Sequence, residues 1–243
     1  MIANIQVSFL GERVLFMKNT IELTNISQSF TLNDKTVTLF EQLNLNFEQG
    51  KSYAITGPSG AGKSSLLMLA SGLEKPSTGK GVYNKNNAAY ALEELRADIG
   101  FIFQQFHLLP ELTALNNVAL PLKLRGDKKA LVKAEKWLEK VGLIERKDHK
   151  PSELSGGEQQ RVAIARALVF EPKFIFADEP TGNLDPKSAD DIANLLIACC
   201  KENNAGLIMV THSQLLAERA EYIYQLTQGA LDLVASPKLE GAA

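Results

Sequence analysis

The sequence predicts an α/β fold built on a mainly parallel β-sheet. Short apolar segments recur along the chain, and each is followed by a longer segment with helical spacing, which is typical of α/β proteins. The apolar segments are continuous rather than alternating, as expected of strands buried on both faces of a parallel sheet. The segments that carry this interpretation are residues 53–56, 100–103, 174–177 and 207–211.

The first part of the chain predicts a different kind of sheet. Residues 21–47 alternate more strictly between apolar and polar side chains, and they contain the turn signal Asn33-Asp34. Such alternation is typical of strands with only one buried face. We therefore expect an antiparallel sheet at this edge of the domain.

Two later segments have clear helical periodicity. Residues 128–143 and the alanine-rich residues 158–169 place apolar side chains at helical spacing. The expected buried faces consist of Leu131, Ala134, Leu138 and Val141 in the first segment and of Val162, Ala165 and Val169 in the second.

Composition is that of an ordinary globular protein. The chain has 243 residues, of which 45% are hydrophobic and 22% charged, which excludes a disordered or collagenous chain. Lys+Arg number 26 and Asp+Glu 28, so the charge balance demands neither nucleic acid nor an anionic membrane as a partner. No apolar run approaches the roughly 18 residues that span a bilayer. The cysteines Cys199 and Cys200 are adjacent, which fits neither an ordinary disulfide nor a zinc site, so we expect a reducing cytosolic compartment.

We expect a single domain over residues 17–243. Residues 1–16 precede the first clear strand pattern, and we expect them to be a disordered or wrongly assigned start. The apolar part of this segment has no Lys or Arg before it, and Gly11-Glu12-Arg13 interrupts it, which argues against a signal peptide.

A glycine-rich loop follows the first buried strand. The segment Gly57-Pro58-Ser59-Gly60-Ala61-Gly62-Lys63-Ser64 fits the phosphate-loop pattern, which occurs by chance in roughly 1 in 100 chains of this length. Glycines let successive N–H groups point at phosphate oxygens, and the helix expected from Ser64 to Ala70 adds its N-terminal dipole. Lys63 would reach the β- and γ-phosphates, and the Ser64 hydroxyl would take Mg²⁺. The loop alone does not separate a kinase from a GTPase or a transport ATPase.

An acidic pair ends the apolar strand 174–177. In phosphate-loop proteins an aspartate at this place, here Asp178, holds Mg²⁺ through its water shell. The adjacent Glu179 could orient or deprotonate an attacking water, a contribution of about 10²–10⁴ in rate. Two solvated carboxylates at a strand end are the alternative interpretation, and the glycine-rich loop favours the functional one.

A second helix N-terminus carries two consecutive glycines. In Leu154-Ser155-Gly156-Gly157-Glu158, Ser155 and Glu158 fit a capping box. A capping box does not explain Gly156 and Gly157, because glycine costs backbone entropy. Close approach of a phosphate to the helix end would explain them, so the segment predicts a second anion site.

Three segments together resemble the nucleotide-binding subunits of ABC transporters. They are the loop Gly57 to Ser64, the LSGGE segment at 154–158 and the ADEPTGNLD segment at 177–185, and the resemblance extends over about residues 21–232. It implies a P-loop NTPase (RecA-like) core with an N-terminal antiparallel β subdomain and an α-helical signature subdomain at roughly 105–160. The sequences of these motifs are similar to those of the branch that includes macrolide exporters, lipoprotein-release systems and the cell-division ATPase.

The resemblance also implies a head-to-tail homodimer that binds ATP and Mg²⁺ at two shared sites. Ser155, Gly156 and Gly157 would contact the γ-phosphate held by the other copy, and Asp185 belongs to the loop that crosses the interface. Glu158 stands where the family commonly has Gln, and we expect it to cap its own helix more than to bind nucleotide.

Further site residues follow from the same resemblance. Gln104 would contact Mg²⁺ or the attacking water, and His212 would contact the γ-phosphate. Phe30 stands where the family stacks an aromatic ring on adenine, usually Tyr, and Ser65 stands where many members have Thr. Gln104, Asp178-Glu179, His212 and the glycine-rich loop all follow buried strands, which agrees with ligand binding beyond the carboxyl ends of an open sheet.

A chain without a membrane span needs a separate transmembrane permease subunit to move a solute. The apolar segment 106–115 either receives that partner or packs in the core. We expect a cytoplasmic ATPase, peripheral on the inner face of the cytoplasmic membrane, that drives export or release of a lipoprotein or envelope substrate. The alternative is a regulatory ABC ATPase that signals through a membrane protein to cell-wall hydrolysis without transport. A soluble repair or translation ATPase is disfavoured, because there is neither a coiled-coil insertion nor a second phosphate loop, and no nucleic-acid partner is expected.

Overall fold

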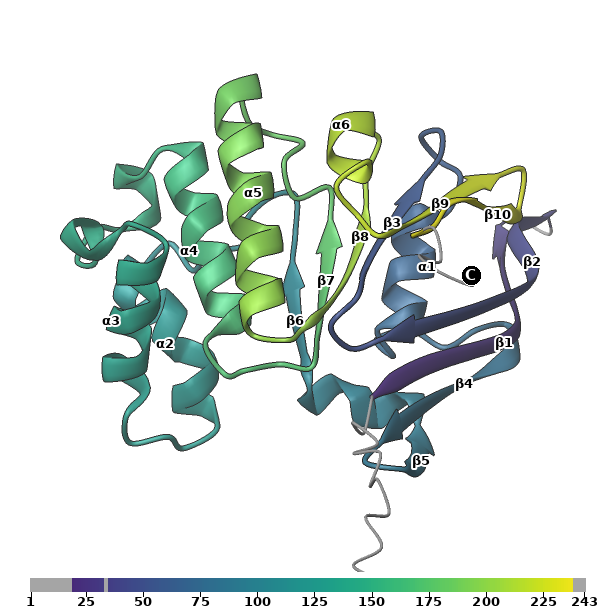
Figure 1. Cartoon of the computed structure of the whole chain (residues 1–243), viewed down its shortest axis with the longest axis horizontal. Coiled ribbons are helices and arrows are strands. Elements are labelled where there is room, and N and C mark those ends of the chain that lie inside the picture. Colours follow the sequence, from purple (N-terminus) through teal and green to yellow (C-terminus); the bar gives the residue numbers. More distant parts are fainter. Residues whose placement is uncertain (1–18, 33–34, 238–243) are drawn as a thin grey trace, which may run out of the picture.

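The computed structural model describes residues 19–32 and 35–237, and its elements form two sheets and a group of helices (Figure 1). The expected start segment 1–16 and the turn Asn33-Asp34 lie outside the described residues.

A six-stranded sheet forms the centre of the fold, in the order β10-β9-β3-β8-β7-β6. Its members are β3 (Ser52–Thr56), β6 (Ile99–Ile102), β7 (Phe174–Asp178), β8 (Gly206–Val210), β9 (Tyr222–Thr227) and β10 (Ala230–Ala235). All neighbouring pairs are parallel except β9 and β10. The four predicted strands and their parallel arrangement are therefore confirmed.

The expectation that all four apolar strands are buried on both faces is wrong for β6. The core residues of β3, β7 and β8 are buried, but β6 alternates, with Ile99 and Phe101 partly exposed and Gly100 and Ile102 buried. The reason is its place at the edge of the sheet, where only β7 is its neighbour.

The second sheet is antiparallel, as predicted, with the order β2-β1-β4-β5. Its strands are β1 (Thr20–Leu32), β2 (Lys35–Glu48), β4 (Thr78–Lys85) and β5 (Ala88–Ala91), and the short 3₁₀ helix Leu92–Ala97 follows them. The helix α1 (Lys63–Ala70) is buried between the two sheets, where its leucines join Phe40 and Phe47 from β2 and Phe174 and Phe176 from β7.

The helix α5 (Pro186–Glu202) covers the other face of the central sheet. Ile192, Leu196, Cys199 and Cys200 of this helix pack against side chains of β3, β7 and β8. Both cysteines are free, and burial raises the pKa of each thiol, so they serve as core residues.

Three helices form a separate cluster beside the sheet. They are α2 (Ala114–Leu124), α3 (Ala130–Lys140) and α4 (Gly156–Leu168), with the short 3₁₀ helices Ile144–Arg146 and Pro151–Glu153 between α3 and α4. The predicted buried residues Ala134, Leu138 and Val141 and those of the segment 158–169 are confirmed. Leu131 is a correction: it is 44% exposed, because the buried face of α3 runs through Ala130, Ala134 and Leu138 at four-residue spacing.

The last helix, α6 (Gln214–Ala217), follows β8 and precedes β9 in the chain. Within residues 19–32 and 35–237, no helix combines the length and apolar character that crossing a membrane requires.

Candidate functional site

The glycine-rich loop joins β3 to α1 in a conformation that needs its glycines. Gly62 caps α1 with φ 92°, a left-handed conformation that glycine adopts readily. Gly57 has φ 147°, and a Cβ there would collide with the carbonyl of Leu226 on β9. The backbone can therefore curl as a phosphate cradle requires.

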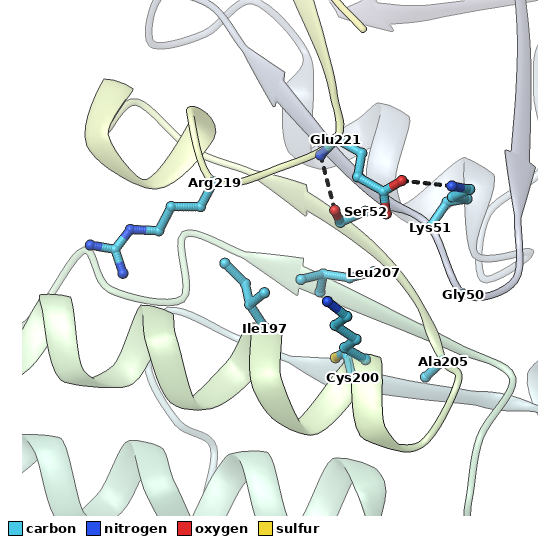
Figure 2. A pocket seen from close by; sticks show the side chains of 10 residues that line it. Gly50, Lys51, Ser52, Ile197, Cys200, Ala205, Leu207, Arg219 and Glu221 are labelled. Carbon is cyan, nitrogen blue, oxygen red and sulfur yellow. Dashed lines mark hydrogen bonds and ion pairs between the residues drawn. The ribbon is translucent and has the colours of Figure 1, made fainter. Parts of the chain in front are cut away.

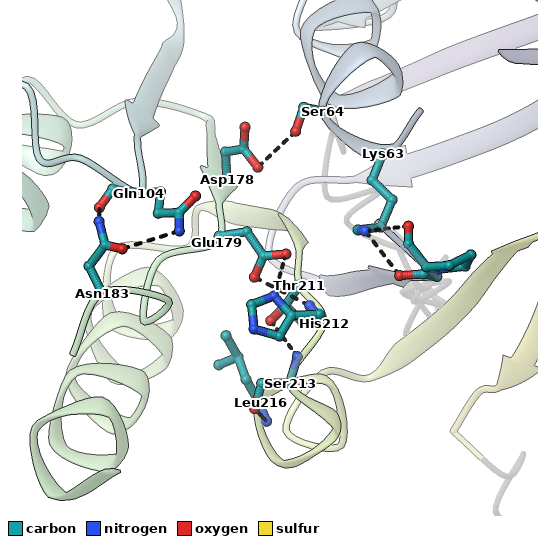
Figure 3. A network of polar contacts seen from close by, with 12 residues as sticks. Lys63, Ser64, Gln104, Asp178, Glu179, Asn183, Thr211, His212, Ser213 and Leu216 are labelled. Carbon is teal, nitrogen blue, oxygen red and sulfur yellow. Dashed lines mark hydrogen bonds and ion pairs between the residues drawn. The ribbon is translucent and has the colours of Figure 1, made fainter. Parts of the chain in front are cut away.

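Lys63 and Ser64 direct their side chains toward this loop and toward β7 (Figure 3). The Lys63 ammonium donates to the carbonyl oxygens of Gly57 and Pro58, each at 3.0 Å, so it lies inside the loop. The Ser64 hydroxyl donates to Asp178 Oδ1 at 3.1 Å. Burial raises the pKa of Asp178, and the neighbouring Glu179 acts in the same direction, whereas the bond from Ser64 and the charge of Lys63 lower it.

Ser64 and Asp178 form an oxygen pair that suits a hard cation. Mg²⁺ is usually held by one or two carboxylates together with the phosphates of its substrate rather than by an all-protein cage. Among the residues described, no cluster of three His, Cys, Asp or Glu side chains could hold a metal ion alone. The donor set therefore fits Mg²⁺ only in company with a nucleotide.

Glu179 and His212 form a second polar pair at the same edge of the sheet. His212 Nδ1 lies 2.9 Å from Glu179 Oε1, and the His212 backbone N–H donates to Glu179 Oε2 at 3.3 Å. Glu179 has φ 46°, and its own N–H donates to the carbonyl of Val210 on β8. This turn aims the carboxylate at the end of β8, while His212 is largely exposed beside it.

Gln104 is held by a residue whose role sequence analysis missed. Its Nε2 donates to Asn183 Oδ1 at 3.2 Å, and Asn183 Nδ2 donates back to the Gln104 carbonyl at 2.9 Å. The sequence places Asn183 in Asn183-Leu184-Asp185, the loop expected to cross the dimer interface, and predicts no contact between Asn183 and Gln104. Nothing in its local sequence marks this contact, because the two residues are 79 positions apart.

These side chains surround one cavity of about 530 Å³. The cavity brings together most of the predicted catalytic and phosphate-binding residues, and it adds Leu39 of β2, an apolar residue that carried no chemical signal. Its lining consists of Leu39, Ser59, Gly60, Gly62, Lys63, Ser64, Ser65, Gln104, Asp178, Glu179 and His212.

The segment 154–158 does not contribute to this cavity. Ser155 and Glu158 form the predicted capping box: Ser155 Oγ accepts from the Glu158 N–H at 3.3 Å, and Glu158 Oε2 accepts from the Ser155 N–H at 2.8 Å. The Ser155 N–H and the Ser155 hydroxyl both donate to the Glu158 carboxylate, and these two bonds lower the pKa of Glu158. A Cβ at Gly156 or Gly157 would meet its nearest neighbours at 3.4 and 3.6 Å, which is ordinary contact, so packing within one chain does not explain the two glycines.

Asp185 and Phe30 also lie outside the lining of the cavity. Asp185 caps α5 by accepting from the N–H groups of Lys187 and Ser188, and hydrogen bonds from the Ser188 side chain and backbone are the main reason that its pKa is lowered. Phe30 is 43% exposed on β1, opposite Val37 of β2. It is thus an accessible aromatic ring near the strand end rather than a core residue.

A second cavity lies at the opposite, amino end of the parallel strands (Figure 2). It measures about 250 Å³ and is lined by residues that include Ser52, Cys200 and Leu207. Two of its three cationic side chains have partners: Lys51 pairs with Glu221 at 2.7 Å, and Arg219 donates to Asn194 Oδ1 at 2.6 Å and pairs with Asp190. The third, Lys201, is exposed at the rim. This cavity offers no comparable set of reactive groups.

Comparisons with known proteins agree with this geometry. A family model described as ABC transporter matches residues 40–182. The lipoprotein-releasing system ATP-binding protein LolD of Rickettsia bellii is 44% identical over 221 residues, which are 89% of this chain and 100% of that protein. LolD of Legionella pneumophila is 45% identical over 222 residues, 88% of this chain and 98% of that protein.

Two similar solved structures are dimers of the ATP-binding cassette MJ0796. One is a post-hydrolysis state bound to ADP and Pi, with a TM-score of 0.77 and 35% identity, and it covers 89% of this chain and 100% of the other. The second, a bacterial ABC transporter cassette, has the same TM-score and coverage with 36% identity.

Proposed function

Because this chain belongs to the ABC transporter family and is an ATPase of that family, we propose that it powers a separate membrane subunit in the release of lipoproteins or related envelope substrates. Support comes from relatives above 40% identity over nearly their whole length whose names specify lipoprotein release. We propose that the chain is located at the inner face of the cytoplasmic membrane, where the membrane subunit holds it.

The cavity residues have distinct parts in the proposed ATP hydrolysis. The N–H groups of residues 57–64 and the Lys63 ammonium hold the β- and γ-phosphates. Ser64, Asp178 and Gln104 hold Mg²⁺, which when bound offsets the charge that develops on the phosphates. Glu179 takes a proton from the water that attacks the γ-phosphorus. The bond between the γ-phosphorus and the oxygen bridging to the β-phosphate then breaks, which releases ADP and phosphate.

His212 is proposed to position the Glu179 carboxylate. Its contact with Glu179 Oε1 at 2.9 Å holds the carboxylate at one orientation, and its largely exposed ring is free to approach a γ-phosphate. Asn183 holds Gln104 in a corresponding way from the other side of the cavity.

The ATP-bound state is proposed to be a head-to-tail homodimer. One chain carries two separate helix N-termini suited to anions, those of α1 and α4, and only the first opens on the cavity. Gly156 and Gly157 each have room for a Cβ within one chain, which leaves a partner's nucleotide as the reason for them. Ser155 and Asp185 then lie at the interface, and two-fold symmetry closes both sites together.

The apolar segment 106–115 has some side chains that pack in the core and others that are exposed and could contact the membrane subunit. Leu108 and Leu115 pack on the helical cluster, whereas Leu109 is exposed. Asn117, fully buried on α2, accepts from the Leu109 N–H at 2.8 Å and donates to the Leu109 carbonyl at 3.1 Å. We propose that this rigid loop, with Leu109 outward, receives the membrane subunit.

The observation that carries the ATPase mechanism is the convergence of Lys63, Ser64–Asp178, Glu179–His212 and Gln104 on one cavity. Glu179→Gln tests it. The variant should bind ATP, lose about 10²–10⁴ of its turnover because the proton acceptor is gone, and accumulate as a dimer in size-exclusion chromatography.

The matched control is Glu139→Gln, which removes an exposed carboxylate on α3 and should hydrolyse ATP normally. Unchanged turnover in Glu179→Gln would show that the assignment of the base is wrong. Transport is tested separately, by reconstituting the chain with a membrane subunit that co-purifies with it and measuring ATP-dependent lipoprotein release from vesicles.

A further inference from the structure

The turn that joins α2 to α3 concentrates positive charge. We call residues 123–133 the basic tip; it contains five basic side chains and one acidic one, Asp127, although the whole chain has 26 basic and 28 acidic residues. The basic residues are Lys123, Arg125, Lys128, Lys129 and Lys133.

Little of this charge is neutralised inside the protein. Lys133 pairs with Asp127 at 2.8 Å, and this contact holds the pKa of Asp127 below its usual range. Arg125 donates to a backbone carbonyl and lies 4.1 Å above the ring of Phe170, and neither partner carries a charge. Lys128 and Lys129 are exposed and have no ion pair within the part of the chain that the structure describes.

The basic tip also exposes aliphatic side chains. Leu124 is 80% exposed, Val132 55% and Leu131 44%. Their neighbours Leu122 and Ala130 are buried in the helical cluster. The end of α2 and the start of α3 are therefore fixed to the cluster, and they hold the exposed side chains in place. Exposed aliphatic groups among unneutralised lysines are typical of surfaces that bind at the membrane interface.

The position of the basic tip leaves the nucleotide cavity free. Arg125 Nη2 donates at 2.8 Å to the carbonyl of Ala97, which lies just before the amino end of β6. The cavity lies beyond the carboxyl ends of the parallel strands, and Figure 1 shows the α2–α3 connection at the opposite end of the molecule. A surface bound to the basic tip would not cover the cavity.

We propose that the basic tip binds the surface of a membrane that contains anionic lipids. The lysine ammonium groups contact lipid phosphates, and Leu124, Leu131 and Val132 enter the interfacial region. Nucleic acid fits less well, because the residues 123–133 include no aromatic side chain on which a base could stack. The proposal does not depend on the transported substrate or on ATP hydrolysis.

The test is sedimentation of the full chain with vesicles of phosphatidylcholine alone or mixed with phosphatidylglycerol. We expect binding to the mixed vesicles only, weakening as salt rises because exposed charges are screened. Lys128→Glu with Lys129→Glu should lower the partition coefficient about tenfold or more. Leu124→Ser should lower it about fivefold without changing the salt dependence.

The matched control reverses two exposed lysines elsewhere, Lys80→Glu with Lys201→Glu, and should bind mixed vesicles like the wild type. An unchanged melting temperature and ATPase rate would show that the variants of the basic tip are folded. Glu179→Gln should still bind, which separates this proposal from the proposed catalysis.

Two results would overturn the proposal. The first is wild-type protein that ignores anionic vesicles or binds both kinds equally. The second is variants of the basic tip that keep vesicle binding but lose the membrane subunit in co-purification, since the occupant would then be a protein.

Discussion

At the scale of single residues, Asp178 shows how the proposed site opposes stability. Its carboxylate is half-buried at the end of β7 beside Glu179, and burial is the main reason that its pKa is raised. A raised pKa in the folded state means that folding disfavours the charged form. The stabilisation from the protonated form is therefore complete at low pH and is lost as the pH rises through the folded-state pKa.

Asp178→Asn should accordingly melt at a higher temperature than the wild type at neutral pH, because it removes the buried charge. The difference should shrink as the pH falls through the range in which Asp178 takes up its proton. The same variant should lose Mg²⁺-dependent ATPase activity. Calorimetry across pH checks the first part, and a lower melting temperature at neutral pH would contradict it.

Lys63 is the residue on which phosphate affinity is expected to depend most. Lys63→Ala removes the charge inside the loop, and hydrogen bonds to charged groups contribute about 1.5–3 kcal/mol. We expect ATP affinity to fall by roughly 10- to 100-fold in titration calorimetry. Lys201→Ala, which removes an exposed lysine of α5, should bind ATP normally.

At the scale of elements, α4 connects the two halves of the proposed mechanism. Its N-terminus carries Ser155 to Gly157, and two of its later side chains hold loops that carry cavity residues. Gln160, fully buried, donates to the carbonyl of Pro180 at 2.7 Å, next to Glu179. Arg166 donates to the carbonyls of Phe106 and His107 at 2.7 and 2.6 Å, and both of these residues have positive φ.

Arg166→Met should therefore leave ATP binding nearly intact and lower turnover, because the loop after Gln104 loses the bonds that hold its left-handed turn. Steady-state kinetics should show a reduced kcat with little change in KM. Arg161→Met is the control on the same helix. The Arg161 side chain donates to the carbonyl of Val141, away from the cavity, so the kcat of this variant should stay close to that of the wild type. Equal loss in both variants would indicate general damage to α4.

At the scale of the whole molecule, two distant helix ends in one chain are the main argument for a dimer. Ser155→Arg places a long cation at the proposed interface, where it would prevent closure over the partner's nucleotide. We expect the variant to bind ATP as a monomer and to lose most of its turnover. Ala88→Arg, on the exposed edge strand β5, adds the same charge elsewhere and should dimerise normally; light scattering with ATP distinguishes the two.

Features that depend on residues close together in the chain could be read from the amino-acid order alone. Continuous apolar segments, glycines at forced turns and a Ser-Gly-Gly-Glu helix start depend on neighbouring residues, so the parallel strands, the glycine-rich loop and the capping box could all be predicted. The family resemblance then brought Gln104 and His212 into the same proposed site as Lys63 and Glu179.

Features that depend on residues far apart in the chain became visible in the folded molecule alone. The partial exposure of β6 follows from its edge position, and that of Leu131 from which face of α3 meets α2 and α4. The pairing of Asn183 with Gln104, the entry of Leu39 into the cavity and the hold of Arg166 on residues 106–107 join residues far apart in the chain. Such contacts leave no local periodicity or motif, because they arise only once the sheets and helices have packed.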